Sequence, residues 1–214
     1  MIGDQTDIKK EYLILAKEVW DQIEKKINTK AAKLVIAIGG ESGSGKTILA
    51  SALKITGEER NKNAAVLHQD DYFKLPPETN HNARLQDINA VGKDEVRLDL
   101  MQEHTASFKN GVSSIIKPLV DYKKNSFIEE SINFEEVEIL ILEGTYVLGL
   151  HQINCKIFID RNFLQTKKNR MARNRDHQDE FVEKVLSIEH EIIKKYKGEA
   201  DIIVEDRKST RLNS

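Results

Sequence analysis

A glycine-rich segment between an apolar run and a helical pattern constrains the fold of this chain most. Residues 33–40 (KLVIAIGG) are apolar and rich in β-branched side chains, which is typical of a buried strand. A helical pattern starts at about residue 46, and residues 40–47 read Gly-x-x-x-x-Gly-Lys-Thr. A strand that ends in this pattern and leads into a helix indicates a phosphate-binding loop, or P-loop.

The P-loop predicts a nucleotide site. Its glycines allow backbone N–H groups to surround phosphate oxygens, Lys46 can reach the β- and γ-phosphates, and the Thr47 hydroxyl can hold Mg²⁺. A glycine–serine turn that matches by chance is the alternative, and the flanking strand and helix argue against it. The predicted nucleotide-binding residues of the loop are Gly40, Ser42, Gly43, Ser44, Gly45, Lys46 and Thr47.

Missing motifs narrow the class of nucleotide-binding protein. A GTPase should carry Asn-Lys-x-Asp, and residues 60–65 (RNKNAA) begin this motif but lack its Asp. A transport ATPase should carry a Leu-Ser-Gly-Gly signature, which does not occur in the sequence. Both absences favour a small-molecule kinase.

Four further apolar runs predict strands of the same sheet. They cover residues 64–70, 137–144, 156–160 and 200–204. Helical patterns separate several of them, at about 46–57, 93–111 and 163–197. This alternation predicts an α/β fold with a parallel sheet that is covered on both faces. Residues 7–30 predict an extra N-terminal amphipathic helix, which we expect to pack on the sheet edge or on a second subunit.

Carboxylates follow three of the predicted strands. Parallel strands all end at one edge of the sheet, where open α/β folds bind their ligands. Asp70, Asp71, Glu143 and Asp160 stand at this edge. A phosphotransferase uses carboxylates to hold Mg²⁺, which suits Glu143, and to orient or deprotonate the acceptor hydroxyl, which suits Asp70. We predict structural roles for Asp71, as a helix cap or Asx turn, and for Asp160, as a cap before a helix near Phe163.

Several motifs occur in an order that is more specific than the P-loop alone. They are HQDDYFK (68–74), IIKPLVDYKKN (115–125), ILEGTYVL (141–148) and a basic stretch before ADIIV (200–204). With them, the chain resembles the uridine kinase and phosphoribulokinase family of P-loop kinases from about residue 33 to 205. The resemblance implies a three-layer P-loop NTPase fold with a mostly parallel five-stranded sheet flanked by helices. It also implies ATP with Mg²⁺ as donor, and a hydroxyl of a nucleoside or related metabolite as acceptor.

The resemblance gives roles to individual residues. Asp70 is similar to the base of the uridine kinases, and Glu143 falls on the family's second magnesium-binding position beside Thr47. The other implied acceptor-site residues are Tyr72, Asp121, Tyr122 and Asn125.

The sequence also departs from the family pattern. Residues 89–96 (NAVGKDEV) hold no Asp where uridine kinases bind the ribose hydroxyls, and Val120 stands in place of a Tyr. The identity of the acceptor is therefore left open. An ATP-binding regulatory or interaction module without metabolite kinase activity is the competing function.

Residues 166–176 (TKKNRMARNRD) form a basic segment that corresponds to the family's mobile lid, expected at 163–178. Arg170 and Arg173 share one helix face, where their guanidinium groups could close over a triphosphate. We expect Arg170, Arg173 and Lys46 to act in catalysis and Arg175 to bind nucleotide. A solvated basic face is the alternative, and a nucleic-acid surface is disfavoured because stacking aromatics are missing.

Bulk composition limits the partners. A formal net charge of -2 and a pI of about 6.3 give no basic field for nucleic acid. Apolar runs are far shorter than the roughly 18 residues that a membrane helix needs. The single Cys155 and a start without a signal-peptide pattern predict a cytoplasmic protein, and a homo-oligomer is left open. We expect one kinase domain over residues 1–206 and a disordered tail over 207–214.

Overall fold

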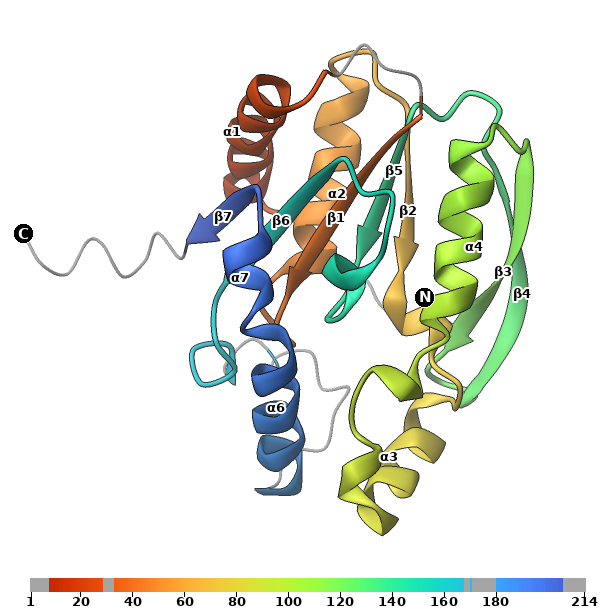
Figure 1. Ribbon diagram of the computed structural model, residues 1–214, viewed down its shortest axis with the longest axis vertical. Helices are drawn as coiled ribbons and strands as arrows, with labels where there is room; N and C mark the ends of the chain where they lie inside the picture. Colours follow the sequence, from red (N-terminus) through yellow and green to blue (C-terminus); the bar gives the residue numbers. More distant parts are fainter. Residues whose placement is uncertain (1–7, 29–32, 168–169, 171–179, 206–214) are drawn as a thin grey trace, which may run out of the picture.

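A five-stranded sheet forms the centre of the molecule, in the order β2-β5-β1-β6-β7 (Figure 1). The computed structural model describes residues 8–28, 33–167, 170 and 180–205. The strands are β1 (Leu34–Gly40), β2 (Ala64–His68), β5 (Ile139–Glu143), β6 (Cys155–Asp160) and β7 (Ile202–Glu205). All neighbouring strands run parallel, so the predicted α/β fold with a five-stranded parallel sheet is confirmed.

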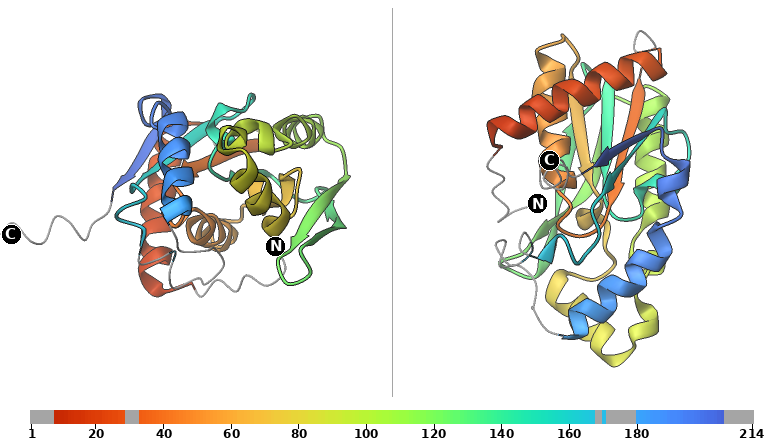
Figure 2. Two further views of the ribbon diagram at one scale, coloured as in Figure 1. Left: turned by 90° about the horizontal axis from the view of Figure 1, so that it is seen from below. Right: turned by 90° about the vertical axis from the view of Figure 1, so that its left-hand side faces the viewer.

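Alternate side chains of the central strand face opposite helical layers. Ile36 and Ile38 of β1 pack with α1 (Lys10–Lys26) and α2 (Lys46–Glu58). Val35 and Ala37 belong to the core on the other face, which α4 (Leu98–Lys109) and the end of α6 (Glu180–Ile193) cover. Figure 2 shows helices on both sides of the sheet. Every residue of β1 is buried, which explains its uninterrupted apolar sequence.

The N-terminal helix α1 packs on the helix that follows the P-loop. The indole N–H of the buried Trp20 donates a hydrogen bond of 3.0 Å to the Leu53 carbonyl of α2. Arg60, just after α2, forms ion pairs with Asp21 and Glu24 of α1. The helix also contacts the edge strand β7, which agrees with the expectation that it packs on the edge of the sheet. Several residues at the two ends of the predicted range 7–30 lie outside the described part of the chain.

A hairpin and a helix beside the sheet are additions to the expected fold. β3 (Ser114–Asp121) and β4 (Ser126–Asn133) form an antiparallel hairpin, and α3 (Pro77–Gln86) follows the end of β2 by a short loop. Neither is predicted from the sequence. Pro77 occupies one of the first helical positions of α3, where a proline is tolerated because the N–H that it lacks would have no helical partner. Pro76, the residue before it, is the N-cap, so two adjacent prolines stand at the start of this helix.

The remaining helices begin and end differently from the predicted ranges. The helix expected over 93–111 begins at Leu98, after a 3₁₀ turn at Lys93–Glu95. Within the described part of 163–197, α6 ends at Ile193 and α7 (Tyr196–Glu199) follows. Further 3₁₀ turns are η1 (Gln69–Tyr72), η2 (Ile88–Ala90) and η4 (Val147–Gly149). No helix in the described ranges has the length and apolar character needed to cross a membrane. The expected tail 207–214 and most of the expected lid lie outside these ranges.

Candidate active site

The P-loop connects β1 to α2 and contains three glycines with positive φ. Gly40, Gly43 and Gly45 have φ angles of 148°, 74° and 104°, where side chains are disfavoured. At Gly43 a β-carbon would also lie 2.7 Å from Cγ of Arg170. Gly43 is therefore required both by its backbone conformation and by the close approach of another segment.

The polar P-loop residues point to different partners. The Lys46 ammonium donates to the Glu41 carbonyl at 2.9 Å, and the Thr47 hydroxyl donates to Oε1 of Glu143 at 3.3 Å. The Ser44 side chain is 2% exposed, and none of the described residues hydrogen-bonds to its hydroxyl oxygen. Lys46 and Thr47 thus lie where the sequence pattern predicts them, at the carboxyl edge of the sheet.

Glu143 lies at the end of β5 beside His68 at the end of β2. The two residues are register partners, and Nδ1 of His68 lies 2.7 Å from Oε1 of Glu143. Burial raises the pKa of Glu143, but the hydrogen bond and charge of His68 and the charge of Lys46 outweigh it, so the net pKa is lowered. Glu143 therefore stays ionised beside Thr47. No role is predicted for His68 from the sequence, because only strand register brings it to this carboxylate.

Asp70 lies in the 3₁₀ turn η1, just beyond the end of β2. Its Oδ2 accepts a hydrogen bond of 3.0 Å from the Tyr122 hydroxyl. Burial and the nearby Glu143 carboxylate raise the pKa of Asp70, whereas the Lys46 charge and the Tyr122 hydrogen bond lower it, with a net rise. A carboxylate with a raised pKa in a cavity has the properties of a general base.

Replacing Tyr122 by phenylalanine should move the acidic limb of the pH–rate profile to higher pH. The Tyr122 hydroxyl stabilises the ionised form of Asp70, so its loss raises the pKa of Asp70 further. A base acts only when ionised, and activity therefore falls as pH falls through this pKa. The measurement is kcat/KM against pH for Y122F and wild type. If the acidic limb of the profile lay at the same pH in Y122F, the ionisation of Asp70 would not determine it.

Asp71 and Tyr72 turn away from the site. Asp71 is fully buried, where its Oδ2 lies 2.7 Å from the Lys117 ammonium and its Oδ1 accepts from the Val120 N–H at 3.0 Å. The structural role expected of Asp71 is thus correct, but it is a buried ion pair rather than a cap. The structure does not bring Tyr72, an expected acceptor-site residue, to the site: its side chain is fully buried with its hydroxyl 2.8 Å from Nδ1 of His104.

Three other carboxylates and amides form local structural contacts. Oδ1 of the buried Asp121 accepts from the N–H groups of Lys123 and Lys124, which shapes the hairpin turn. Asn125 accepts from the Glu78 N–H, which ties the turn to α3. Asp160 pairs with Lys197 at 2.7 Å. The capping role near Phe163 that is expected of Asp160 belongs to Asn162 instead. Of the residues implied for the acceptor besides Asp70, the structure brings only Tyr122 to the base.

A cavity of about 690 Å³ opens beside Asp70. It lies between η1, α3, the β3–β4 turn and α6, and its walls include both apolar and charged side chains. Arg84 in its wall forms ion pairs with Glu95 at 2.5 Å and with Glu189 of α6 at 3.3 Å. The lining residues include Asp70, Arg84, Tyr122, Arg170 and Glu189. The cavity is large enough for a small organic molecule.

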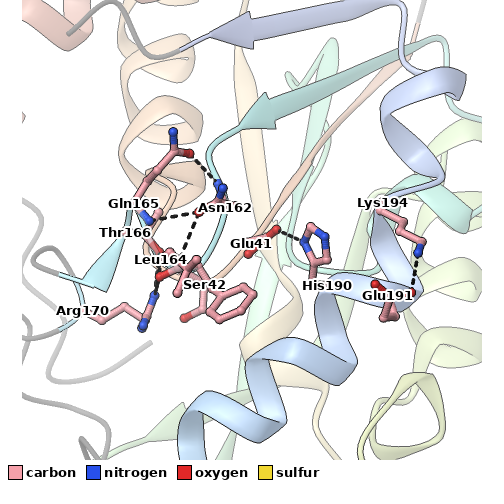
Figure 3. Close-up of polar contacts among 11 residues, drawn as sticks. Glu41, Ser42, Asn162, Leu164, Gln165, Thr166, Arg170, His190, Glu191 and Lys194 are labelled. Carbon is pink, nitrogen blue, oxygen red and sulfur yellow. Dashed lines mark hydrogen bonds and ion pairs between the residues drawn. The ribbon is translucent and has the colours of Figure 1, made fainter. Parts of the chain in front are cut away.

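The start of the expected lid closes over the P-loop. The Thr166 hydroxyl donates to the Ser42 carbonyl at 2.8 Å, and Nη1 of Arg170 donates to the Thr166 hydroxyl at 2.6 Å (Figure 3). Arg170 is 3% exposed and lies against Gly43. The structure therefore brings Arg170 to the P-loop as predicted, while Arg173 and Arg175 lie outside the described residues.

A second contact links the P-loop to the helix beyond the lid. Nδ1 of His190 on α6 lies 2.5 Å from Oε1 of Glu41, whose side chain is 7% exposed (Figure 3). Glu41 is the residue whose carbonyl accepts from Lys46. Neither residue is predicted as part of the site from the sequence, because a contact between positions 149 apart leaves no local signal.

Comparison with known proteins settles the family. Residues 35–210 match the family described as Phosphoribulokinase / Uridine kinase. The chain belongs to this family of P-loop kinases. The family is one of phosphotransferases, and it implies the use of ATP. α1 begins and ends before the matched residues.

Two relatives of this chain are distant from it in sequence, and a solved structure shares its fold. Uridine kinase from Latilactobacillus sakei is 28% identical over 195 residues, which cover 86% of this chain and 90% of that protein. The bifunctional alpha-galactosidase/sucrose kinase AgaSK from Mediterraneibacter gnavus is 28% identical over 204 residues, which cover 88% of this chain but only 22% of AgaSK. A solved "possible uridine kinase" from Bacillus stearothermophilus shares the fold, with 19% identity, a TM-score of 0.59 and coverage of 87% and 99% of the two chains.

Proposed function

We propose that this protein transfers the γ-phosphate of ATP to a hydroxyl group of a small molecule, a nucleoside or a related metabolite. The observation that carries the proposal is the position of Asp70. Its carboxylate lines the cavity, accepts from Tyr122, and lies close enough to Lys46 for that charge to lower its pKa. A hydroxyl bound in the cavity would thus lie between a base and the phosphate end of the P-loop.

The P-loop residues fit a nucleotide with Mg²⁺. Thr47 and the ionised Glu143 offer hard oxygen ligands 3.3 Å apart, which would hold Mg²⁺ directly or through water. Bound Mg²⁺ would neutralise charge on the phosphate oxygens. Lys46 and Arg170 would stabilise the charge on the transferred group, and Arg173 and Arg175 are proposed to complete the lid.

The charge balance of the cavity favours a neutral acceptor. Arg84 is paired with both Glu95 and Glu189, so its positive charge is already balanced. Paired carboxylate and guanidinium groups offer hydrogen-bond acceptors and donors to hydroxyl groups without an excess of positive charge. An acceptor that carries a phosphate or carboxylate would gain little from such a wall. Nucleosides and sugars are therefore the first compounds to test.

An acceptor-dependent ADP-release assay should identify the reaction. Purified protein with ATP and Mg²⁺ should release ADP at about 1 to 100 per second when the right nucleoside or sugar is added. The same screen with pantothenate-like alcohols and phosphorylated sugars covers acidic acceptors. The Lys46→Ala variant is the negative control, because it should lose both nucleotide affinity and the rate of phosphate transfer. If ATP binds but no acceptor across the panel raises ADP release, the protein is an ATP-binding module instead.

A further inference from the structure

The helix α1 precedes the residues that match the family, yet it packs tightly on α2, the helix that follows the P-loop. Trp20 is 1% exposed, and its indole donates to the Leu53 carbonyl of α2. A β-carbon on Gly57 of α2 would lie 3.1 Å from Cζ2 of Trp20, so the two helices pack closely. The backbone of α1 is therefore held in a defined position relative to α2.

Tyr12 lies in the first turn of α1, and its side chain lies beside Gly45 of the P-loop. Its hydroxyl oxygen lies 3.6 Å, and its ring Cε1 3.7 Å, from the position that a β-carbon of Gly45 would occupy. The side chain is partly exposed, and it packs at the border of the core beneath α1. Among the residues that the structure describes, none hydrogen-bonds to the Tyr12 hydroxyl. An aromatic ring thus flanks Gly45, the loop residue directly before α2.

The arrangement of the sheet gives the direction in which a bound nucleotide must extend. Thr47, at the P-loop position that holds Mg²⁺ beside the β- and γ-phosphates, donates to Glu143 at the end of β5, and Asp70 lies just after the end of β2. The γ-phosphate end therefore points toward β2 and β5. The opposite side of β1, away from these carboxylates, is where β6, β7 and α1 lie (Figures 1 and 2).

We propose that Tyr12 is a nucleotide-binding residue, whose ring packs against the nucleoside half of the donor nucleotide. The proposal rests on the proposed function, transfer of phosphate from ATP, and adds a residue that lies outside the matched family region. Base and ribose have apolar faces that an aromatic side chain can cover, and such stacking tolerates different bases. Because Tyr12 sits on the helix attached to α2, α1 is part of the donor site as well as of the core.

Tyr12→Ala should weaken nucleotide binding without weakening triphosphate binding. We expect the Kd of a fluorescent ATP analogue, and the displacement constants of ATP and ADP, to rise about tenfold, within the range that base stacking supplies. Displacement by inorganic tripolyphosphate should change less than about twofold, because the P-loop amides still bind it. Tyr12→Phe keeps the ring and should resemble wild type. Ile14→Ala is the matched control on α1, because Ile14 is 50% exposed.

Three outcomes would overturn the proposal. Unchanged ATP affinity in Tyr12→Ala would show that the ring does not touch the nucleoside. An equal loss for ATP and tripolyphosphate would show that Tyr12 acts only by supporting Gly45. If the wild-type protein bound neither ATP nor tripolyphosphate, the proposed function would fail together with this inference. The first two outcomes, in contrast, would overturn only the role of Tyr12. A thermal unfolding curve for each variant confirms that the nucleotide effect is not a loss of fold.

Discussion

Asp70→Asn should lower kcat by about 10²- to 10⁴-fold, the usual contribution of a general base. The carboxylate that accepts from Tyr122 in the cavity is replaced by an amide that cannot take up a proton. ATP binding should stay close to that of wild type, because the P-loop and Glu143 are unchanged. Single-turnover phosphate transfer and nucleotide titration measure the two effects separately. Wild-type turnover in this variant would remove Asp70 from the catalytic mechanism.

The same variant should not be destabilised. Burial and the Glu143 charge raise the pKa of Asp70 above its ordinary value. A raised folded-state pKa means that the native state binds the proton more tightly than the unfolded chain, so stability is lost as pH rises through that pKa. Asparagine removes this charge, and the melting temperature at neutral pH should be equal to or above that of wild type. Inactivity together with normal melting would separate a catalytic loss from misfolding.

The P-loop and the positions of Asp70 and Glu143 could be predicted because their causes are local. Gly40, Gly45, Lys46 and Thr47 are close in sequence, and the turn from strand to helix requires those residue types. Asp70 and Glu143 follow apolar runs, and parallel topology brings the ends of such runs to one edge. These predictions needed only the strand direction, which the alternation of strands and helices supplies.

The roles of neighbouring side chains could not be predicted in the same way. Asp70 and Asp71 are adjacent, and in the 3₁₀ turn η1 they point to different surroundings. Tyr72 points into the core beside His104, although its position in the motif implies a site residue. In a turn of this kind each residue points in its own direction, and only the packing around it decides which side chain is buried.

Contacts between segments that are far apart in the sequence could not be predicted either. His68 meets Glu143 because β2 and β5 pair in one register. The β3–β4 hairpin is not predicted from the sequence because its strands carry apolar residues on the exposed side, such as Ile116 at 64% and Ile128 at 46% exposure. A clean alternation of apolar and polar residues, the usual signal of a half-buried strand, is therefore absent there.

Lys117→Met should cost about 3 to 5 kcal/mol of unfolding free energy, as expected when one partner of a buried ion pair is removed. Lys117 is 2% exposed and links Asp71 of η1 to the hairpin strand β3. Methionine keeps much of the apolar volume, so the loss reports the charge left on the fully buried Asp71. Urea unfolding measures the change. Glu130→Gln is the matched control: Glu130 also pairs with Lys117 but is 42% exposed, and it should change stability by less than about 1 kcal/mol.

The double variant Asp71→Asn/Lys117→Met tests whether the loss comes from the unpaired charge. With both charges removed, no buried ion is left without its partner, and the double variant should be more stable than Lys117→Met alone. The Val120 N–H can still donate to the asparagine oxygen, which keeps the backbone contact of β3. If the double variant lost as much stability as the sum of the single variants, the pair would not be coupled. Recovery would show that the loss in Lys117→Met comes from the unpaired charge of Asp71, the neighbour of the residue that we propose as the base.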